Sequence, residues 1–145
     1  MIEIRTISAA QARAVRHAVL RPNWRIEDNI YPGDDGESTF HVGMFDGTSL
    51  VGVASVFNEA PPNRQSDTAW RLRGMAVHPP YQRKGNGGKL LEIVIAYVSE
   101  ADGTELWCNA RANARTFYEE HGFKAQGEEF VLPGIGPHYF MLKAL

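Results

Sequence analysis

The sequence has few of the features that mark secreted or membrane-spanning proteins. Cys108 is the only cysteine among the 145 residues, so an internal disulfide is impossible and a disulfide-stapled secreted fold is excluded. No stretch approaches the roughly 20 apolar residues of a membrane helix. The first 20 residues carry charged side chains where a signal peptide needs an unbroken apolar run. We therefore expect a cytoplasmic protein with no membrane partner.

An excess of charge of one sign is also lacking. Fifteen basic and 17 acidic side chains give a formal net charge of −2, so no overall positive field exists to bind nucleic acid. The histidines show no ligand spacing such as H-x-x-x-H, and we predict no metal site. With 43% hydrophobic and 22% charged residues, the composition is that of an ordinary folded domain. Its length suits one core, which predicts a single domain over residues 1–145.

The apolar periodicity and the turn signals predict a mixed chain with the element order β-α-β-β-β-α-β-α-β-β. The Asp46-Gly47 pair between the second and third strands is typical of a hairpin, and three consecutive strands suggest an antiparallel meander. Residues 22–38 read as a long loop or a loop with a short helix. We expect strands at 2–7, 39–45, 50–58, 69–78, 105–110, 123–133 and 138–145, and helices at 9–20, 89–100 and 113–121.

The join between strand 69–78 and the helix after it carries the most information, and reads MAVHPPYQRKGNGGK over residues 75–89. Three glycines within four residues leave backbone N–H groups uncovered at the start of a helix, where unpaired donors and the positive end of the helix dipole also lie. Arg83, Lys84 and Lys89 add positive charge. The segment is either a phosphate or pyrophosphate site or a flexible, solvated turn.

Two common phosphate loops do not match this segment. The P-loop pattern G-x-x-x-x-G-K-[ST] fails because Arg83 stands where its first glycine is needed and Leu90 follows Lys89. The dinucleotide pattern G-x-G-x-x-G also fails at Leu90, and it belongs after the first strand of an alternating β-α-β fold. Here a meander of strands comes first.

A different family matches the residues. The segment QRKGNG (82–87) resembles the [RQ]-x-x-G-x-[GA] signature of the GNAT superfamily of acyl-CoA-dependent N-acyltransferases, and MAVHP (75–79) resembles the strand before that loop. Downstream, NARANARTFYEEHGF (109–123) is similar to the strand–helix segment of the family that ends F-Y-x-x-x-G-F. GIGPHYFM (134–141) resembles the last strand of one bacterial subgroup of unassigned members. The resemblance covers residues 70–141.

The resemblance implies an α/β (α+β) fold of the GNAT type, with a splayed, mixed, largely antiparallel sheet and helices on both faces. It implies acetyl-CoA as co-substrate and no metal, with the pantetheine arm between strands 69–78 and 105–110. Backbone groups of residues 75–77 would bind the pantetheine amides and, near Val77, polarise the thioester carbonyl. The pyrophosphate would bind backbone N–H groups of residues 83–88. The implied cofactor-binding residues are Met75, Ala76, Val77, Arg83, Lys84, Gly85, Asn86, Gly87, Gly88 and Asn109.

By the same resemblance, Tyr118 is the catalytic acid that protonates the departing CoA thiolate, a step suited to a neutral phenol. The alternative is a core aromatic residue whose hydroxyl meets solvent. Many members carry Asn where Arg111 stands, and Asn109 or Asn113 is the candidate to replace its bond to the pantetheine. Cys108 reads as a buried, inert thiol rather than a nucleophile.

The acceptor side is less defined. The segment 22–38 contains five acids and one arginine, which suggests that it attracts a cationic amine; a solvated acidic loop is the alternative. The attacking ammonium must lose a proton to a base or to a water chain. The five acids are Glu27, Asp28, Asp34, Asp35 and Glu37, and the candidate bases are Glu59, Glu128, Glu129 and His138.

These observations predict a transferase of the EC 2.3.1 type, an N-acetyltransferase that moves an acetyl group from acetyl-CoA to a primary amine by direct attack in a ternary complex. The amine belongs to a small molecule or a peptide, and the last strands are expected to support a homodimer, as in many relatives. A non-catalytic acyl-CoA-binding or regulatory module of the same fold is the main alternative. A nucleotide-phosphate binder unrelated to CoA is the third.

Overall fold

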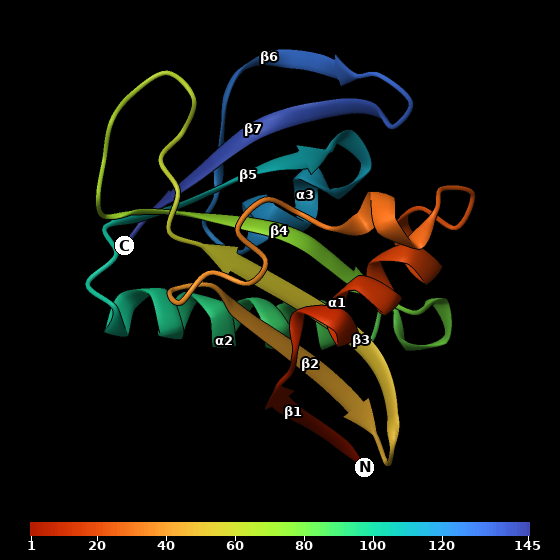
Figure 1. Cartoon of the computed structure of the whole chain (residues 1–145). Helices are drawn as coiled ribbons and strands as arrows, with labels where there is room; N and C mark the ends of the chain where they lie inside the picture. The colour runs from red at the N-terminus through yellow and green to blue at the C-terminus, as the bar shows by residue number, and fades with distance from the viewer. The chain divides into compact units, whose positions relative to one another are not determined.

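The computed structural model describes every residue from Met1 to Leu145. The chain forms two compact units: unit 1 contains Met1–Phe57 and Leu72–Tyr97, and unit 2 contains Asn58–Arg71 and Val98–Leu145. The chain passes between them within strand β4 (Ala69–Val77) and within helix α2 (Asn86–Glu100). Seven strands form one sheet in the order β1-β2-β3-β4-β5-β7-β6, and the predicted order of elements is confirmed (Figure 1).

Unit 1 begins with three antiparallel strands that lie side by side in Figure 1. The turn between the second and third strands is the predicted hairpin, in which Gly47 has a φ of 62° and Asp46 pairs with Ser49. A positive φ is cheap only without a Cβ, which explains the glycine. The strands are β1 (Ile2–Thr6), β2 (Phe40–Asp46) and β3 (Ser49–Phe57).

Helix α1 (Ala9–Val15) starts at a capping box, as its sequence predicts. The Gln11 N–H donates to Ser8 Oγ (3.1 Å), and the Ser8 N–H donates to Gln11 Oε1 (2.9 Å). The expected helix 9–20 is not regular throughout, because its last five residues form a π-helical turn, η1 (Arg16–Leu20). After it, residues 22–38 contain one short 3-10 helix, η2 (Ile26–Asn29), as one of the two predictions for this segment requires.

Helices cover both faces of the sheet in unit 1. Val53 of β3 belongs to the same buried cluster as Ala12 and Val15 of α1, whereas a Cβ on Gly52 would lie 3.2 Å from Leu90 of α2. Neighbouring residues of a strand point to opposite faces, so α1 and α2 pack on opposite sides. The predicted α2 face is fully buried at Leu91, Val94 and Val98, together with Leu90, while Ile95 is half-buried; the helix starts at Asn86 rather than Lys89.

Unit 2 makes the sheet mixed. The first part of β4 pairs in parallel with β5, Ala69–Arg71 alongside Glu105–Trp107, and the other pairs, β5 with β7 and β6 with β7, are antiparallel. This parallel pairing covers three residues of each strand, which is what a splayed sheet requires. The predicted helix 113–121 is a 3-10 turn followed by a short α-helix. The elements are β5 (Glu105–Arg111), η4 (Ala112–Ala114), α3 (Arg115–Glu120), β6 (Lys124–Leu132) and β7 (Gly136–Ala144).

None of the helices has both the length and the apolar character needed to cross a membrane.

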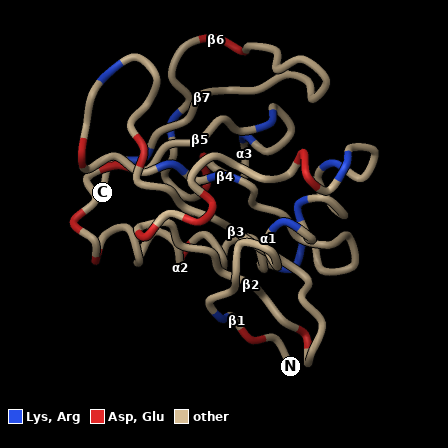
Figure 2. Tube along the Cα trace, in the orientation of Figure 1, with Lys and Arg blue, Asp and Glu red and all other residues tan.

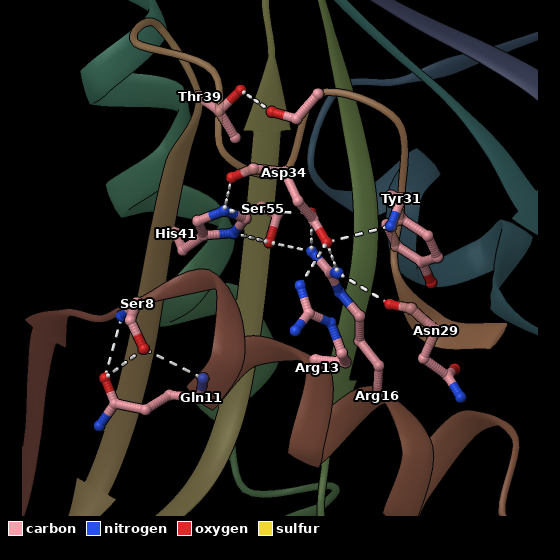
Figure 3. A network of polar contacts seen from close by, with 11 residues as sticks. Ser8, Gln11, Arg13, Arg16, Asn29, Tyr31, Asp34, Thr39, His41 and Ser55 are labelled. Atoms are coloured by element: carbon pink, nitrogen blue, oxygen red, sulfur yellow. Dashed lines mark hydrogen bonds and ion pairs between the residues drawn. The ribbon is translucent and has the colours of Figure 1, made fainter. Parts of the chain in front are cut away.

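A buried polar network ties the segment 22–38 to the rest of unit 1 (Figure 3). Arg16 is completely buried and holds the Asp34 carboxylate with two hydrogen bonds of 2.8 and 3.0 Å. It also donates to Ser55 Oγ (2.9 Å) and to the Asn29 carbonyl (3.2 Å). His41 Nε2 lies 2.8 Å from the Asp34 carbonyl and His41 Nδ1 lies 2.7 Å from Ser55 Oγ. Because a carbonyl only accepts, Nε2 carries the proton there.

The electrostatics of Asp34 result from two opposing effects. Burial would raise the pKa of Asp34, but hydrogen bonds from Arg16 and from the Tyr31 N–H outweigh burial, so its pKa lies below the ordinary value. A carboxyl group with a lowered pKa in the folded state stabilises the fold above its unfolded pKa, and this stabilisation is lost as the pH falls through the folded pKa.

Gly74 allows this network to contact strand β4. Its φ is 70°, within the strand, and a Cβ at this position would lie 2.7 Å from Arg16 Nε and 2.9 Å from Tyr31 Cε2. Both the backbone conformation and the space therefore require glycine. Arg16 and Tyr31 consequently pack directly against the strand at the residue before Met75.

We predict that Asp34→Asn destabilises the protein by about 3–5 kcal/mol, because it leaves the buried Arg16 guanidinium without its counter-charge. Urea unfolding at neutral pH measures the loss. The difference from wild type should begin to shrink as the pH falls below the ordinary aspartate pKa of about 4, and disappear only below the lower pKa that Asp34 has in the folded protein.

Asp28→Asn is the matched control, since Asp28 also pairs with an arginine, Arg25 at 3.2 Å, but lies exposed. Its unfolding midpoint should stay close to wild type. Equal effects of the two variants would show that the buried ion pair is not the anchor of this segment.

We further predict that Gly74→Ala destabilises the protein more than Gly47→Ala. Both glycines have a positive φ, 70° and 62°, so both substitutions carry the backbone cost of roughly 1–2 kcal/mol. Only Gly74→Ala also forces a Cβ onto Arg16 and Tyr31, because nothing lies within 4 Å of a Cβ at Gly47. Thermal unfolding of both variants gives the comparison; similar melting temperatures would contradict the close approach at Gly74.

Candidate functional site

The segment that follows β4 is fixed to the β2–β3 hairpin within unit 1. The His78 N–H donates to the Val51 carbonyl at 2.8 Å, and a short 3-10 turn, η3 (Pro79–Tyr81), follows. The Tyr81 hydroxyl donates to Asp46 Oδ2 at 2.6 Å. This bond, followed by the contact with the N-terminal ammonium, lowers the pKa of Asp46 below its ordinary value, while Asp46 raises the pKa of Tyr81. The start of the glycine-rich segment is therefore held in place.

The sign of φ alternates along part of the glycine-rich segment, as it does in many anion-binding loops. Arg83 and Gly85 have φ values of 60° and 80°, whereas φ at Lys84 between them is not positive. Such alternation turns successive N–H groups toward one side. The Lys89 N–H makes a helical hydrogen bond with the Gly85 carbonyl (3.2 Å), so the N–H groups just before it precede the regular ladder of α2.

Two side chains hold this loop in place through hydrogen bonds to backbone carbonyls. Gln82 Nε2 donates to the Val77 carbonyl (2.7 Å), and Asn86 Nδ2 donates to the Tyr81 carbonyl (2.9 Å). Asn86 is buried, so its side chain supports the loop rather than facing a ligand. The Val77 carbonyl already has one donor, although a carbonyl oxygen can accept a second.

Unit 1 thus holds most of the predicted cofactor-binding residues. Ala76 is buried and its neighbours Met75 and Val77 are half-buried on β4, while Arg83 and Lys84 extend into solvent on the loop. The Gln82–Val77 bond joins the strand to the loop, and Gly85 has open space where a Cβ would be. The backbone here can offer N–H donors with two cations nearby, which suits a diphosphate.

Tyr118, the predicted acid, lies on α3 in unit 2 and is 8% exposed. Its ring packs against Phe117 and Phe123, with centroids 5.1 and 5.3 Å away. Burial, with a smaller contribution from Cys108, raises the pKa of Tyr118 well above its ordinary value, so the phenol is neutral at physiological pH. The Tyr118 ring therefore packs in the core, and its hydroxyl stays protonated and can donate that proton.

The remaining predicted residues of this side also belong to unit 2. Asn109 is a half-buried residue of β5, opposite Phe140 of β7, and Asn113 lies in the turn η4. Cys108 is buried, and burial raises its pKa to about 12, which leaves an uncharged thiol as the sequence suggests.

The four candidate bases occupy different surroundings in unit 2. Glu59 is committed to an ion pair with Arg71 at 3.0 Å. Glu128 and Glu129 are exposed where the pairing of β6 with β7 is irregular. His138 is buried, with Nδ1 2.8 Å from the Gly136 carbonyl. These contacts leave Glu128 and Glu129 as the carboxylates with no ion pair, and do not bring the four together.

The structure weakens the hypothesis that the segment 22–38 attracts a cation. Asp34 is buried and forms an ion pair with Arg16. Arg25 forms ion pairs with Asp28 at 3.2 Å and with Glu27 at 3.9 Å. Of the five acids, this leaves Asp35 and Glu37 without a basic partner. In Figure 2, basic stretches mark α1 and the segment that follows, next to the acidic ones. The sequence interpretation counted charges within the segment alone and missed Arg16, as well as the requirement for Gly74.

Comparison with known proteins gives concordant matches. Residues 5–143 match the model of the acetyltransferase (GNAT) domain family. The chain is 37% identical over 145 residues to YitI, an uncharacterized N-acetyltransferase of Bacillus subtilis (strain 168), covering all of this chain and 97% of that protein.

Among solved structures, a putative N-acetyltransferase from Lactobacillus plantarum has a TM-score of 0.78 at 20% identity, over 99% of this chain and 98% of that one. An aminoglycoside 6′-N-acetyltransferase in complex with coenzyme A has a TM-score of 0.72 at 15% identity, over 98% and 96% of the two chains. These two show the shared fold. With the family match along nearly the whole length, they establish that the chain belongs to the GNAT acetyltransferase family.

Proposed function

We propose that this protein is an acyltransferase of the EC 2.3.1 type that moves an acetyl group from acetyl-CoA to a primary amine by direct attack in a ternary complex. The observation that carries the proposal is the loop of residues 83–88, with two left-handed residues and free-standing cations at the start of α2, in a chain of the GNAT family. The aminoglycoside 6′-N-acetyltransferase, whose fold is similar, was solved in complex with coenzyme A.

Acetyl-CoA is a co-substrate in this proposal, and unit 1 supplies its binding groups. Backbone N–H groups of residues 83–88 would hold the pyrophosphate, with Arg83 and Lys84 near its negative charges. The residues just before, Met75 to Val77, would bind the pantetheine amides and polarise the thioester carbonyl. Because Tyr81 and Gln82 already hold the loop in place, little ordering remains to be done on binding.

The chemistry needs three proton movements. The acceptor ammonium first loses a proton to a base or a water chain, and its nitrogen lone pair then forms a bond to the thioester carbon. The carbon–sulfur bond breaks, and the Tyr118 hydroxyl gives its proton to the departing sulfur. The products are an acetylated amine and CoA with a free thiol. The nitrogen loses its second proton to solvent as the amide forms, and Tyr118 recovers a proton from solvent, so atoms and charges balance.

Three related expectations accompany this proposal. A cytoplasmic location and the lack of a nucleic-acid partner follow from the composition. A homodimer through the last strands follows from the resemblance to the family. Strand β6 is at the edge of the sheet and exposes Val131 (68%), which suits a strand that meets a second chain.

We predict that the purified protein consumes acetyl-CoA in the presence of at least one member of a primary-amine library, with the product identified by mass spectrometry. Thermal stabilisation by acetyl-CoA, ATP and NAD is measured in parallel. Acetyl-CoA binding without turnover on any amine would favour the non-catalytic module. Stabilisation by ATP or NAD as large as that by acetyl-CoA would favour the nucleotide binder.

Tyr118→Phe should lower kcat by about 100-fold or more and leave the Kd for acetyl-CoA unchanged, because it removes the proton donor and keeps the packed ring. Steady-state kinetics and calorimetry separate the two quantities. Tyr139→Phe is the matched control, since it removes a hydroxyl from β7 beside Arg115, and it should retain near wild-type kcat. Equal kcat for wild type and Tyr118→Phe would overturn the role of Tyr118.

A further inference from the structure

We infer that the acceptor amine carries an oxyanion, a carboxylate or a phosphate, which binds the guanidinium of Arg21 beside Tyr31 and Trp24. This inference rests on the proposed function, because it assigns the chemical class of the acceptor in that reaction.

Guanidinium groups gather around a single aromatic ring in unit 1. Arg16 Cζ and Arg73 Cζ each lie 4.0 Å from the centroid of the Tyr31 ring, and Arg21 Cζ lies 5.6 Å from it. Arg21 Cζ is also 4.8 Å from the Trp24 ring. Tyr31 is only 3% exposed, so these cations are partly withdrawn from water, where electrostatic attraction to a ligand is stronger than at an open surface.

The ion pairs of Arg13, Arg16 and Arg21 do not balance the charge of these three side chains. Asp34 is bound by Arg16 in a bidentate pair and lies 3.8 Å from Arg13, so one carboxylate serves two guanidinium groups. No carboxylate lies within ion-pair distance of Arg21, whose buried Nε has no hydrogen-bond partner. Arg13, Arg16 and Arg21 against Asp34 leave an excess of two positive charges. A buried cationic donor without an acceptor is costly, and an oxyanion would offset that cost.

The arginine group also lies beside strand β4, next to the residues proposed to bind the pantetheine. A Cβ at Gly74 would clash with Arg16 and Tyr31, so both side chains contact this glycine. The next residue along β4 is Met75. Consecutive Cα atoms are about 3.8 Å apart, so this cluster adjoins residues 75–77, to which we assign the pantetheine amides and, near Val77, the thioester carbonyl. Arg21 is linked to this stretch of strand through Tyr31, whose ring centroid lies 5.6 Å from Arg21 Cζ, within unit 1.

The chemistry of the cluster selects the ligand class. Guanidinium groups bind carboxylate and phosphate in a planar, bidentate manner, and the flanking aromatic rings can cover the apolar part of a small ligand. A purely cationic acceptor would meet repulsion here. The acids of the segment 22–38 that would favour it are the exposed Asp35 and Glu37, and Glu27 and Asp28, which share Arg25.

Acetylation of matched amines tests this directly. The pairs are L-alanine against L-alaninamide, for carboxylate, and 2-aminoethyl phosphate against ethanolamine, for phosphate, with putrescine as the cationic amine. We expect kcat/KM for the anionic member of at least one pair to exceed that of its neutral partner by about 10-fold or more, the effect of a charge-assisted hydrogen bond. The pair that responds identifies the oxyanion.

Arg21→Gln should remove this preference by raising KM for the anionic amine, with the Kd for acetyl-CoA and the rate for the neutral amine unchanged, while Arg21→Lys keeps part of it. Arg25→Gln is the matched control, because Arg25 lies four residues further along the chain but is exposed and paired with Asp28. It should keep the preference. Circular dichroism of each variant confirms folding, and an Arg21→Gln variant with an unchanged preference overturns the inference.

A second readout needs no turnover. In the CoA-bound protein, the NMR signal of the Arg21 Nε–H should shift with millimolar acetate or inorganic phosphate and not with putrescine. Equal rates for anionic and neutral amines, with no such shift, would overturn the inference and leave the proposed function standing. If no amine is acetylated at all, the proposed function fails, and the NMR titration alone decides whether the anion site exists.

Discussion

The left-handed backbone at Gly74 is the constraint on which the arrangement in unit 1 depends. It lies within β4 and, without a Cβ, leaves space that the Arg16 side chain and the Tyr31 ring fill. The same residue precedes Met75, where the proposed binding of the pantetheine begins. A single glycine thus places the buried polar network and the proposed acyl-binding backbone against each other, which explains why a side chain is not tolerated there.

The Arg16–Asp34 pair contributes more to the order of unit 1 than to its net stability. Burying two charges costs about as much as their attraction returns, so such pairs contribute little compared with an apolar core. What the pair does is fix the otherwise irregular segment 22–38 onto β2 and β3 through Ser55 and His41. With that segment fixed, the aromatic side chains of Trp24 and Tyr31 can pack beside Arg21, which has no carboxylate within ion-pair distance.

Local sequence patterns correctly predicted the features that depend on contacts between residues close in sequence. The capping box at Ser8, the Asp46-Gly47 hairpin and the order of the strands follow from contacts close in sequence, and the structure confirms them. The start of α2 at Asn86 was missed, because glycines have low helix propensity and the bond from Asn86 to Tyr81 depends on the folded loop. The pairing of Asp34 with Arg16, 18 residues away, and the crowding at Gly74 are tertiary effects that no local pattern contains.

The most direct test of the central claim is an NMR experiment in which backbone amide shifts are recorded as coenzyme A is added. The account predicts large shifts for Met75 to Val77 and for residues 83–88, and unperturbed amides at the β2–β3 hairpin turn around Gly47. Binding of coenzyme A that shifts other amides and leaves residues 83–88 unchanged, or no binding at millimolar concentration, would contradict the account.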